Sequence, residues 1–113
     1  MPDTLTTITA DDLKEELESD QPPVLINTLP RDAYEAKHIP GSVSVPTGDI
    51  DQVEALVPDK DEQIVVYCAN SDCDASPEAA QKLEEKGYTN VADFEAGYAG
   101  WRQSGYPLAG EEA

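Results

Sequence analysis

Short apolar runs alternate with helical patterns along the whole chain, and this alternation constrains the fold more than any other feature. Strand-like runs are expected at residues 6–8, 24–27, 43–45, 64–67 and 91–94. Helical patterns fall between and after them, at 9–17, 31–37, 50–57, 76–86 and 97–104. Strands that alternate with helices form a mostly parallel sheet with helices on both faces. We therefore expect one α/β domain over residues 1–113, with its core at about 6–108 and an acidic tail at 109–113.

The local signals are strongest around one strand and one helix. Residues 64–67 form an unbroken apolar run, which is typical of a strand buried on both faces. The helix at 76–86 is predicted to have Ser76 as its N-cap and Pro77 at its first position. In the two weaker helices, spacing predicts an inward face of Val53, Leu56 and Val57 for 50–57, and of Ala33 and Tyr34 for 31–37.

The charge balance excludes several function classes. Against 24 acidic residues stand only 7 basic ones, which gives a net charge of −17. Such a surface repels nucleic acids and anionic membranes, so neither is an expected partner. The aliphatic runs at 24–26 and 64–66 argue against disorder. Two interpretations of the acidity stay open. The chain could belong to a halophilic archaeon, where the salt of the cytoplasm screens the repulsion between surface acids, or it could be an acidic mesophilic protein.

The sequence also predicts where the protein works. No apolar stretch approaches the length of a membrane span, and the first residues lack the basic and apolar regions of a signal peptide. Two cysteines are too few for a disulfide scaffold. We therefore expect a cytoplasmic protein whose thiols serve some other purpose.

Cys68 is the candidate catalytic residue. It follows the buried strand 64–67 and precedes the helix at 76, so its thiol is expected at the carboxyl edge of the sheet, facing a helix N-terminus. That position stabilises a nucleophilic thiolate, and the loop could cradle a persulfide or an oxyanion with backbone N–H groups. The expected cradle comprises Ala69, Asn70, Ser71, Asp72, Asp74, Ala75 and Ser76.

A structural role for Cys68 is the alternative. Cysteine is a small, often buried residue, and one at a strand end needs no chemistry. The carboxylates of Asp72 and Asp74 favour this alternative, because nearby negative charge raises the pKa of a thiol. No lysine or arginine lies between Cys68 and Pro77 to oppose them.

Four stretches resemble the single-domain rhodanese-like proteins, sulfurtransferases that carry sulfur as a cysteine persulfide. They are VLIN at 24–27, YEAKHIPGSVSVP at 34–46, IVVYC at 64–68 and the segment from AAQKLEEKGY to GYPL at 79–108. The resemblance implies a five-stranded, mainly parallel sheet flanked by helices. It also implies that Cys68 accepts a sulfane sulfur without a cofactor. A thiophilic acceptor, such as cyanide or a protein thiol, would then remove the sulfur.

The chain departs from that family at three places. The loop after Cys68 is longer than usual, its usual arginine is missing with Cys73 in the approximate place, and Asn27-Thr28-Leu29 replaces Asp-Val-Arg. The loop arginine binds dianions in related phosphatases and arsenate reductases, so those activities are not expected here. Thiosulfate is also a dianion, and we expect weak activity with it. A protein persulfide or a polysulfide is the more suitable donor.

Cys73 has three interpretations. It could resolve a Cys68 persulfide by forming a disulfide, protect Cys68 from over-oxidation, or be a bystander thiol. A zinc site is not expected, because Cys68, Cys73 and His38 supply only three ligands and His38 belongs to a separate turn motif. We expect His38 to be structural.

Two rivals to sulfur transfer remain. One is a thiol–disulfide redox protein that uses Cys68 and Cys73. The other is a non-catalytic rhodanese-like module that binds a partner protein, although inactive members commonly lack the cysteine that is present here.

Overall fold

The computed structural model describes residues 6–70 and 72–111. Its strands are β1 (Thr6–Thr7), β2 (Val24–Asn27), β3 (Val43–Ser44), β4 (Ile64–Tyr67) and β5 (Val91–Phe94). Its helices are α1 (Ala10–Leu17), α2 (Arg31–Ala36), the 3₁₀ helix η1 (Thr47–Gln52), α3 (Val53–Leu56), α4 (Ala75–Glu85) and α5 (Gly97–Gln103). The predicted α/β fold is confirmed.

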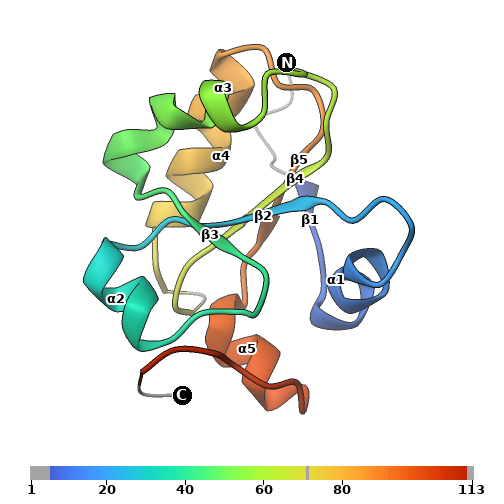
Figure 1. Ribbon diagram of the computed structural model, residues 1–113, viewed down its shortest axis with the longest axis vertical. Coiled ribbons are helices and arrows are strands. Elements are labelled where there is room, and N and C mark those ends of the chain that lie inside the picture. The colour runs from blue at the N-terminus through green and yellow to red at the C-terminus, as the bar shows by residue number, and fades with distance from the viewer. Residues whose placement is uncertain (1–5, 71, 112–113) are drawn as a thin grey trace.

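The five strands form one sheet in the order β1-β5-β4-β2-β3, and every neighbouring pair is parallel. β4 lies in the middle, between β2 and β5, which explains why all four of its residues are buried. The carboxyl ends of the strands therefore meet at one edge, where the loop after β4 begins. Figure 1 shows this sheet crossing the molecule between the helices.

Two apolar layers cover the sheet. On one face Val65, Tyr67 and Phe94 pack with Leu13 of α1 and Trp101 of α5. The other face packs against α4, α3 and η1, and Figure 1 shows α3 and α4 on the opposite side of the sheet from α1. This second layer contains Ile26, Val45, Ile50, Val53, Val57, Ile64, Val66, Ala79, Ala80, Leu83, Tyr88 and Val91.

Several local predictions were wrong. The segment 50–57 is split between a 3₁₀ turn and the single α-turn of α3, and Leu56 is 55% exposed rather than inward. The inward face predicted for α2 is present but shallow: Ala33 and Tyr34 are half-buried, and α2 buries no residue fully. α4 begins at Ala75, so Ser76 lies within its first turn instead of capping it.

The described part of the predicted acidic tail, residues 109–111, makes three backbone hydrogen bonds to an earlier part of the chain. Ala109 pairs with His38 through two backbone hydrogen bonds, of 2.9 and 2.8 Å. The N–H of Glu111 donates to the carbonyl of Glu35 at 2.9 Å. These bonds join the C-terminal segment to α2 and to His38 just after it, while residues 112–113 lie outside the described part of the chain.

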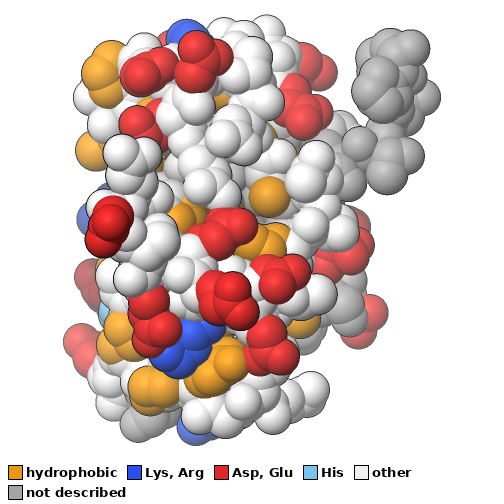
Figure 2. All heavy atoms as spheres, turned by 90° about the vertical axis from the view of Figure 1, so that its right-hand side faces the viewer, with side chains coloured by type: hydrophobic (Ala, Val, Ile, Leu, Met, Phe, Trp, Pro, Cys, Tyr) orange, Lys and Arg blue, Asp and Glu red, His pale blue; other side chains and the backbone are white. Residues whose placement is uncertain are grey.

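The surface carries the expected acidity. The face shown in Figure 2 has many acidic side chains and few basic ones. Some acids are paired, and Lys86 contacts both Asp51 and Glu54. Within the described residues, no helix has the length and apolar character needed to cross a membrane.

Candidate functional site

Cys68 directly follows β4, and its side chain is 1% exposed. The start of α5 holds the backbone at this point: the N–H of Tyr98 donates to the Cys68 carbonyl at 3.0 Å. The N–H of Ala99 donates to the Ala69 carbonyl at the same distance. The backbone that follows the candidate nucleophile is therefore held by a helix that lies far away in the sequence.

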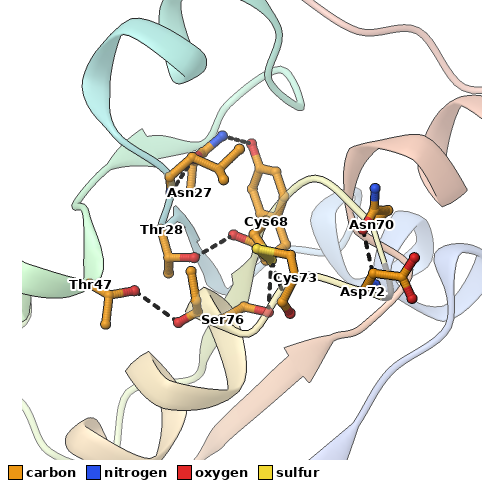
Figure 3. The surroundings of a disulfide bond; sticks show 11 residues. Asn27, Thr28, Thr47, Cys68, Asn70, Asp72, Cys73 and Ser76 are labelled. Atoms are coloured by element: carbon orange, nitrogen blue, oxygen red, sulfur yellow. Dashed lines mark hydrogen bonds between the residues drawn. A yellow bond between two sulfur atoms is a disulfide. The ribbon is translucent and has the colours of Figure 1, made fainter.

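Cys73 returns to Cys68 through a tight turn. The N–H of Cys73 donates to the Asn70 carbonyl at 3.2 Å, and the N–H of Asp72 donates to the Asn70 side chain at 2.9 Å. The Cα atoms of Cys68 and Cys73 are 6.4 Å apart, and their sulfurs are joined as a disulfide (Figure 3). The proximity that the sequence allowed is therefore present, in the oxidised form.

The first turn of α4 lies beside this disulfide. Asp74 occupies the N-cap position but makes no side-chain capping hydrogen bond. The first N–H groups of a helix have no partner within the helix, so Ala75 and Ser76 present donors at this end. The Ser76 hydroxyl lies 3.5 Å from Cys68 Sγ. Thr47 anchors the same turn by donating its hydroxyl to the Ala75 carbonyl at 2.8 Å.

The predicted cradle is only partly brought to Cys68. Ser76 is buried and contacts its sulfur, whereas the side chains of Asn70, Asp72 and Asp74 are exposed. Ala69 and Ala75 are half-buried and take part through their backbone groups. Ser71 lies outside the described residues. The described part of the loop therefore presents carboxylates to solvent and one hydroxyl to the sulfur.

Asp93 is a residue of this region that the sequence reasoning missed. It lies on β5, is 2% exposed, and has one carboxyl oxygen without a hydrogen-bond partner among the described residues. Burial raises the pKa of its carboxyl, a hydrogen bond from Ser76 opposes this, and Glu95 adds to the increase. Ser76, which contacts Cys68 Sγ, therefore also lowers the pKa of this buried carboxyl. An acidic residue within an apolar strand was the signal that could have revealed it.

Tyr67 organises the polar groups on the opposite side of Cys68. Its buried hydroxyl accepts hydrogen bonds from the Ile39 N–H at 2.9 Å and from the Asn27 side chain at 3.1 Å. It also lies 2.8 Å from the Ser42 hydroxyl. Burial raises the pKa of Tyr67, and these hydrogen bonds partly oppose the shift. The hydroxyl therefore connects the turn at 38–42 with the strand that carries Cys68.

Asn27, Thr28 and Leu29, where the sequence differs from the usual Asp-Val-Arg, have structural roles. Besides donating to Tyr67, Asn27 accepts a hydrogen bond from the Leu29 N–H at 2.9 Å. The Thr28 hydroxyl donates to the Tyr67 carbonyl at 3.0 Å. These residues thus hold the end of β2 against the end of β4, directly before Cys68.

His38, which is expected to be structural, contacts Tyr34 in two ways. Its Nδ1 lies 2.7 Å from the Tyr34 carbonyl, so this nitrogen carries the proton and donates. Its ring also stacks on Tyr34. Among residues 6–70 and 72–111, no cluster of three His, Cys, Asp or Glu side chains is arranged to bind a metal.

Comparisons with known proteins agree with this geometry. A family model described as Rhodanese-like domain matches residues 9–104. The solution structure of a rhodanese-like domain from Anabaena superposes with a TM-score of 0.83 and 25% identity, covering 96% of this chain and 82% of that one.

Two curated relatives are longer proteins. The HTH-type transcriptional regulator Rv0324 of Mycobacterium tuberculosis is 32% identical over 74% of this chain and 36% of its own. The adenylyltransferase and sulfurtransferase UBA4 of Candida albicans is 35% identical over 69% of this chain and 19% of its own. The chain thus matches about a third of the first relative and about a fifth of the second. Since the family model spans most of the sequence, the chain belongs to the rhodanese-like family, which is related to sulfurtransferases.

Proposed function

We propose that the protein is a sulfurtransferase that carries sulfane sulfur as a persulfide on Cys68. The observation that carries this proposal is the position of Cys68, at the end of the central strand and in contact with the first turn of α4. Donor groups and the positive end of a helix favour a thiolate, which is the nucleophile that accepts sulfur. The name of the Candida albicans relative supports this reaction class.

The charges of the loop favour particular donors. Asp72 and Asp74 are exposed beside the cysteine pair. No hydrogen bond or ion pair between described residues brings Arg31 or Arg102 to this loop. Thiosulfate would thus meet carboxylates without a compensating cation. We propose a protein persulfide or a polysulfide as donor and a thiol as acceptor, with thiosulfate as a poor substrate.

The proposed setting is a cytoplasm rich in salt. A reducing compartment returns the cysteine pair to thiols, which the reaction requires. The net charge of −17 supports a salt-rich environment, because salt screens repulsion between surface acids.

The test is intact mass and peptide mapping of the reduced protein in molar salt, before and after addition of inorganic polysulfide. We expect one added sulfur in Cys73→Ser, mapped to Cys68 and removed by cyanide. Cys68→Ser is the matched control, because it retains the neighbouring Cys73, and it should gain no sulfur that cyanide removes. Absence of sulfur from Cys68 under these conditions would instead support a non-catalytic binding module.

A further inference from the structure

A persulfide carrier needs one cysteine, and this site has two within bonding distance. Their Cα separation of 6.4 Å lies within the range that a disulfide spans. The turn that starts at Asn70 brings Cys73 back over the strand end through a backbone hydrogen bond. No other acceptor thiol has to diffuse to Cys68 for a second step to occur.

The two cysteines differ in exposure. Cys68 is 1% exposed, whereas Cys73 is half-buried. An external thiol therefore meets the sulfur of Cys73 before that of Cys68. A sulfur atom bound to Cys68 has Cys73 as its neighbouring nucleophile, held at a high effective concentration because both belong to one loop.

We propose that Cys73 resolves the Cys68 persulfide, so that the protein reduces sulfane sulfur to hydrosulfide. This inference rests on the proposed function, and it identifies the acceptor as a thiol of the same chain. The Cys73 thiolate attacks Cys68 Sγ, and a bond forms between the two Sγ atoms. The bond from Cys68 Sγ to the outer sulfur breaks, and its electron pair leaves with that sulfur as hydrosulfide. The outer sulfur gains two electrons, which the two cysteines lose as they become the disulfide.

The acidity of the leaving group and the charges of the loop both favour release of hydrosulfide. Hydrogen sulfide is a stronger acid than an alkyl thiol, so hydrosulfide is a better leaving group than the Cys68 thiolate, which attack on the outer sulfur would expel. The exposed carboxylates of Asp72 and Asp74 repel the departing anion. The disulfide that remains is the state seen in the structure.

A dithiol reductant completes the cycle. One thiolate of the reductant attacks the more exposed Cys73 sulfur and expels Cys68 as a thiolate beside the first turn of α4. The second thiol of the reductant then displaces Cys73 and closes its own disulfide. Both protein thiols are restored, and the reductant supplies the two electrons.

The test is an anaerobic single turnover with reduced, desalted protein and one equivalent of benzenethiosulfonate. This monoanion donates its sulfane sulfur and leaves as a sulfinate, so hydrosulfide forms only when the protein's thiols reduce the transferred sulfur. For the unmodified chain we expect one hydrosulfide per chain, loss of two hydrogens from the intact mass, and a peptide linking Cys68 to Cys73. Cys73→Ser should keep the added sulfur on Cys68 and release hydrosulfide on the order of 100-fold more slowly.

The possible failures are distinguishable. If Cys73→Ser gains no sulfur, the persulfide itself is absent and the proposed function fails. If the unmodified chain keeps a stable persulfide on Cys68, or moves the sulfur to Cys73 without releasing hydrosulfide, only the present inference is overturned. A sample without donor must stay reduced, which excludes oxidation by residual oxygen.

A second variant tests the turn without removing a cysteine. Asn70→Ala removes the side chain that accepts from the Asp72 N–H, so Cys73 is held less firmly. Loading of Cys68 and release of hydrosulfide are measured separately, and we expect the rate of release from the loaded protein to fall by a few-fold. Unchanged release in both Asn70→Ala and Cys73→Ser would overturn the role of Cys73.

Discussion

Gly97 presses against the peptide that follows Cys68. A Cβ atom at Gly97 would lie 2.5 Å from the Cys68 carbonyl oxygen and 2.5 Å from the carbonyl carbon of Ala69. The backbone of Gly97 has φ of +66°, a region that residues with side chains rarely adopt. Only glycine lets the start of α5 approach closely enough to bind both carbonyls.

Gly97→Ala is therefore expected to cost stability and to displace the cysteine loop. Gly105→Ala is the matched control, because Gly105 has φ of +92° but open space where the Cβ would go. Backbone strain alone predicts a loss of about 1 kcal/mol for the control, and the added clash predicts roughly 3 kcal/mol or more for Gly97→Ala. Urea unfolding measures both values, and equal losses would contradict the close-approach argument.

The order of strands and helices was predictable because apolar periodicity reports burial directly. The four-residue strands at 24–27, 64–67 and 91–94 were predicted with correct bounds. The segment 50–57 was misassigned because helical spacing alone does not show which face a tertiary neighbour covers, and Leu56 faces solvent. The contacts of the acidic tail were not predicted, because they are hydrogen bonds between backbone groups of Ala109 and His38 and of Glu111 and Glu35, which leave no mark on the sequence.

The buried carboxyl of Asp93 lowers the stability of the protein at neutral pH, and a neutral side chain would not. Its carboxyl is buried, and one of its oxygens has no partner among the described residues. Because burial raises its pKa, the folded state retains the proton at pH values where the unfolded state has released it. Stability contributed by the protonated form is therefore complete below the unfolded pKa, and it falls as the pH rises through the folded pKa.

Asp93→Asn should consequently stabilise the protein at neutral pH, by on the order of 1 kcal/mol, and reduce the loss of stability between acidic and neutral pH. The asparagine can still accept the hydrogen bond from Ser76. Urea unfolding from pH 4 to 8 measures the effect. Asp74→Asn removes an exposed carboxylate from the same region and serves as the control. A destabilised Asp93→Asn at neutral pH would contradict this account.

The Tyr67 hydroxyl should be a major polar contributor to stability near the site. Tyr67→Phe leaves the Ile39 N–H and the Asn27 amide without their partner in a buried position. Unsatisfied buried donors predict a loss of about 2–4 kcal/mol. Tyr106→Phe is the control, since the Tyr106 hydroxyl bonds Asp11 at the surface, and its expected change is about 0.5 kcal/mol or less. A small loss in thermal or urea unfolding of Tyr67→Phe would refute the assigned role.

The candidate site, like the fold, was only partly predictable from the sequence. Cys68 was found from sequence because a strand, a loop and a helix pattern mark its position. The approach of Cys73 was only one of several interpretations, because loop closure depends on the turn at Asn70 and is not visible in the spacing of two cysteines. Asp93 and Gly97 were missed because each acts from β5 or α5, more than twenty positions after Cys68.

Salt should stabilise the protein strongly. The 24 acidic residues far outnumber the 7 basic ones, so repulsion between acids outweighs ion pairs such as Lys86–Asp51, which screening also weakens. The Debye length falls from about 30 Å at 0.01 M to about 3 Å at 1 M salt. We expect the free energy of unfolding to rise by a few kcal/mol over that range, measured with urea at fixed pH. A Glu15→Lys, Glu84→Lys double variant, which changes two exposed acids, should be more stable than the parent in dilute buffer and gain less from salt. A parent protein that is equally stable in dilute and molar salt would show that its acidic surface does not limit its fold.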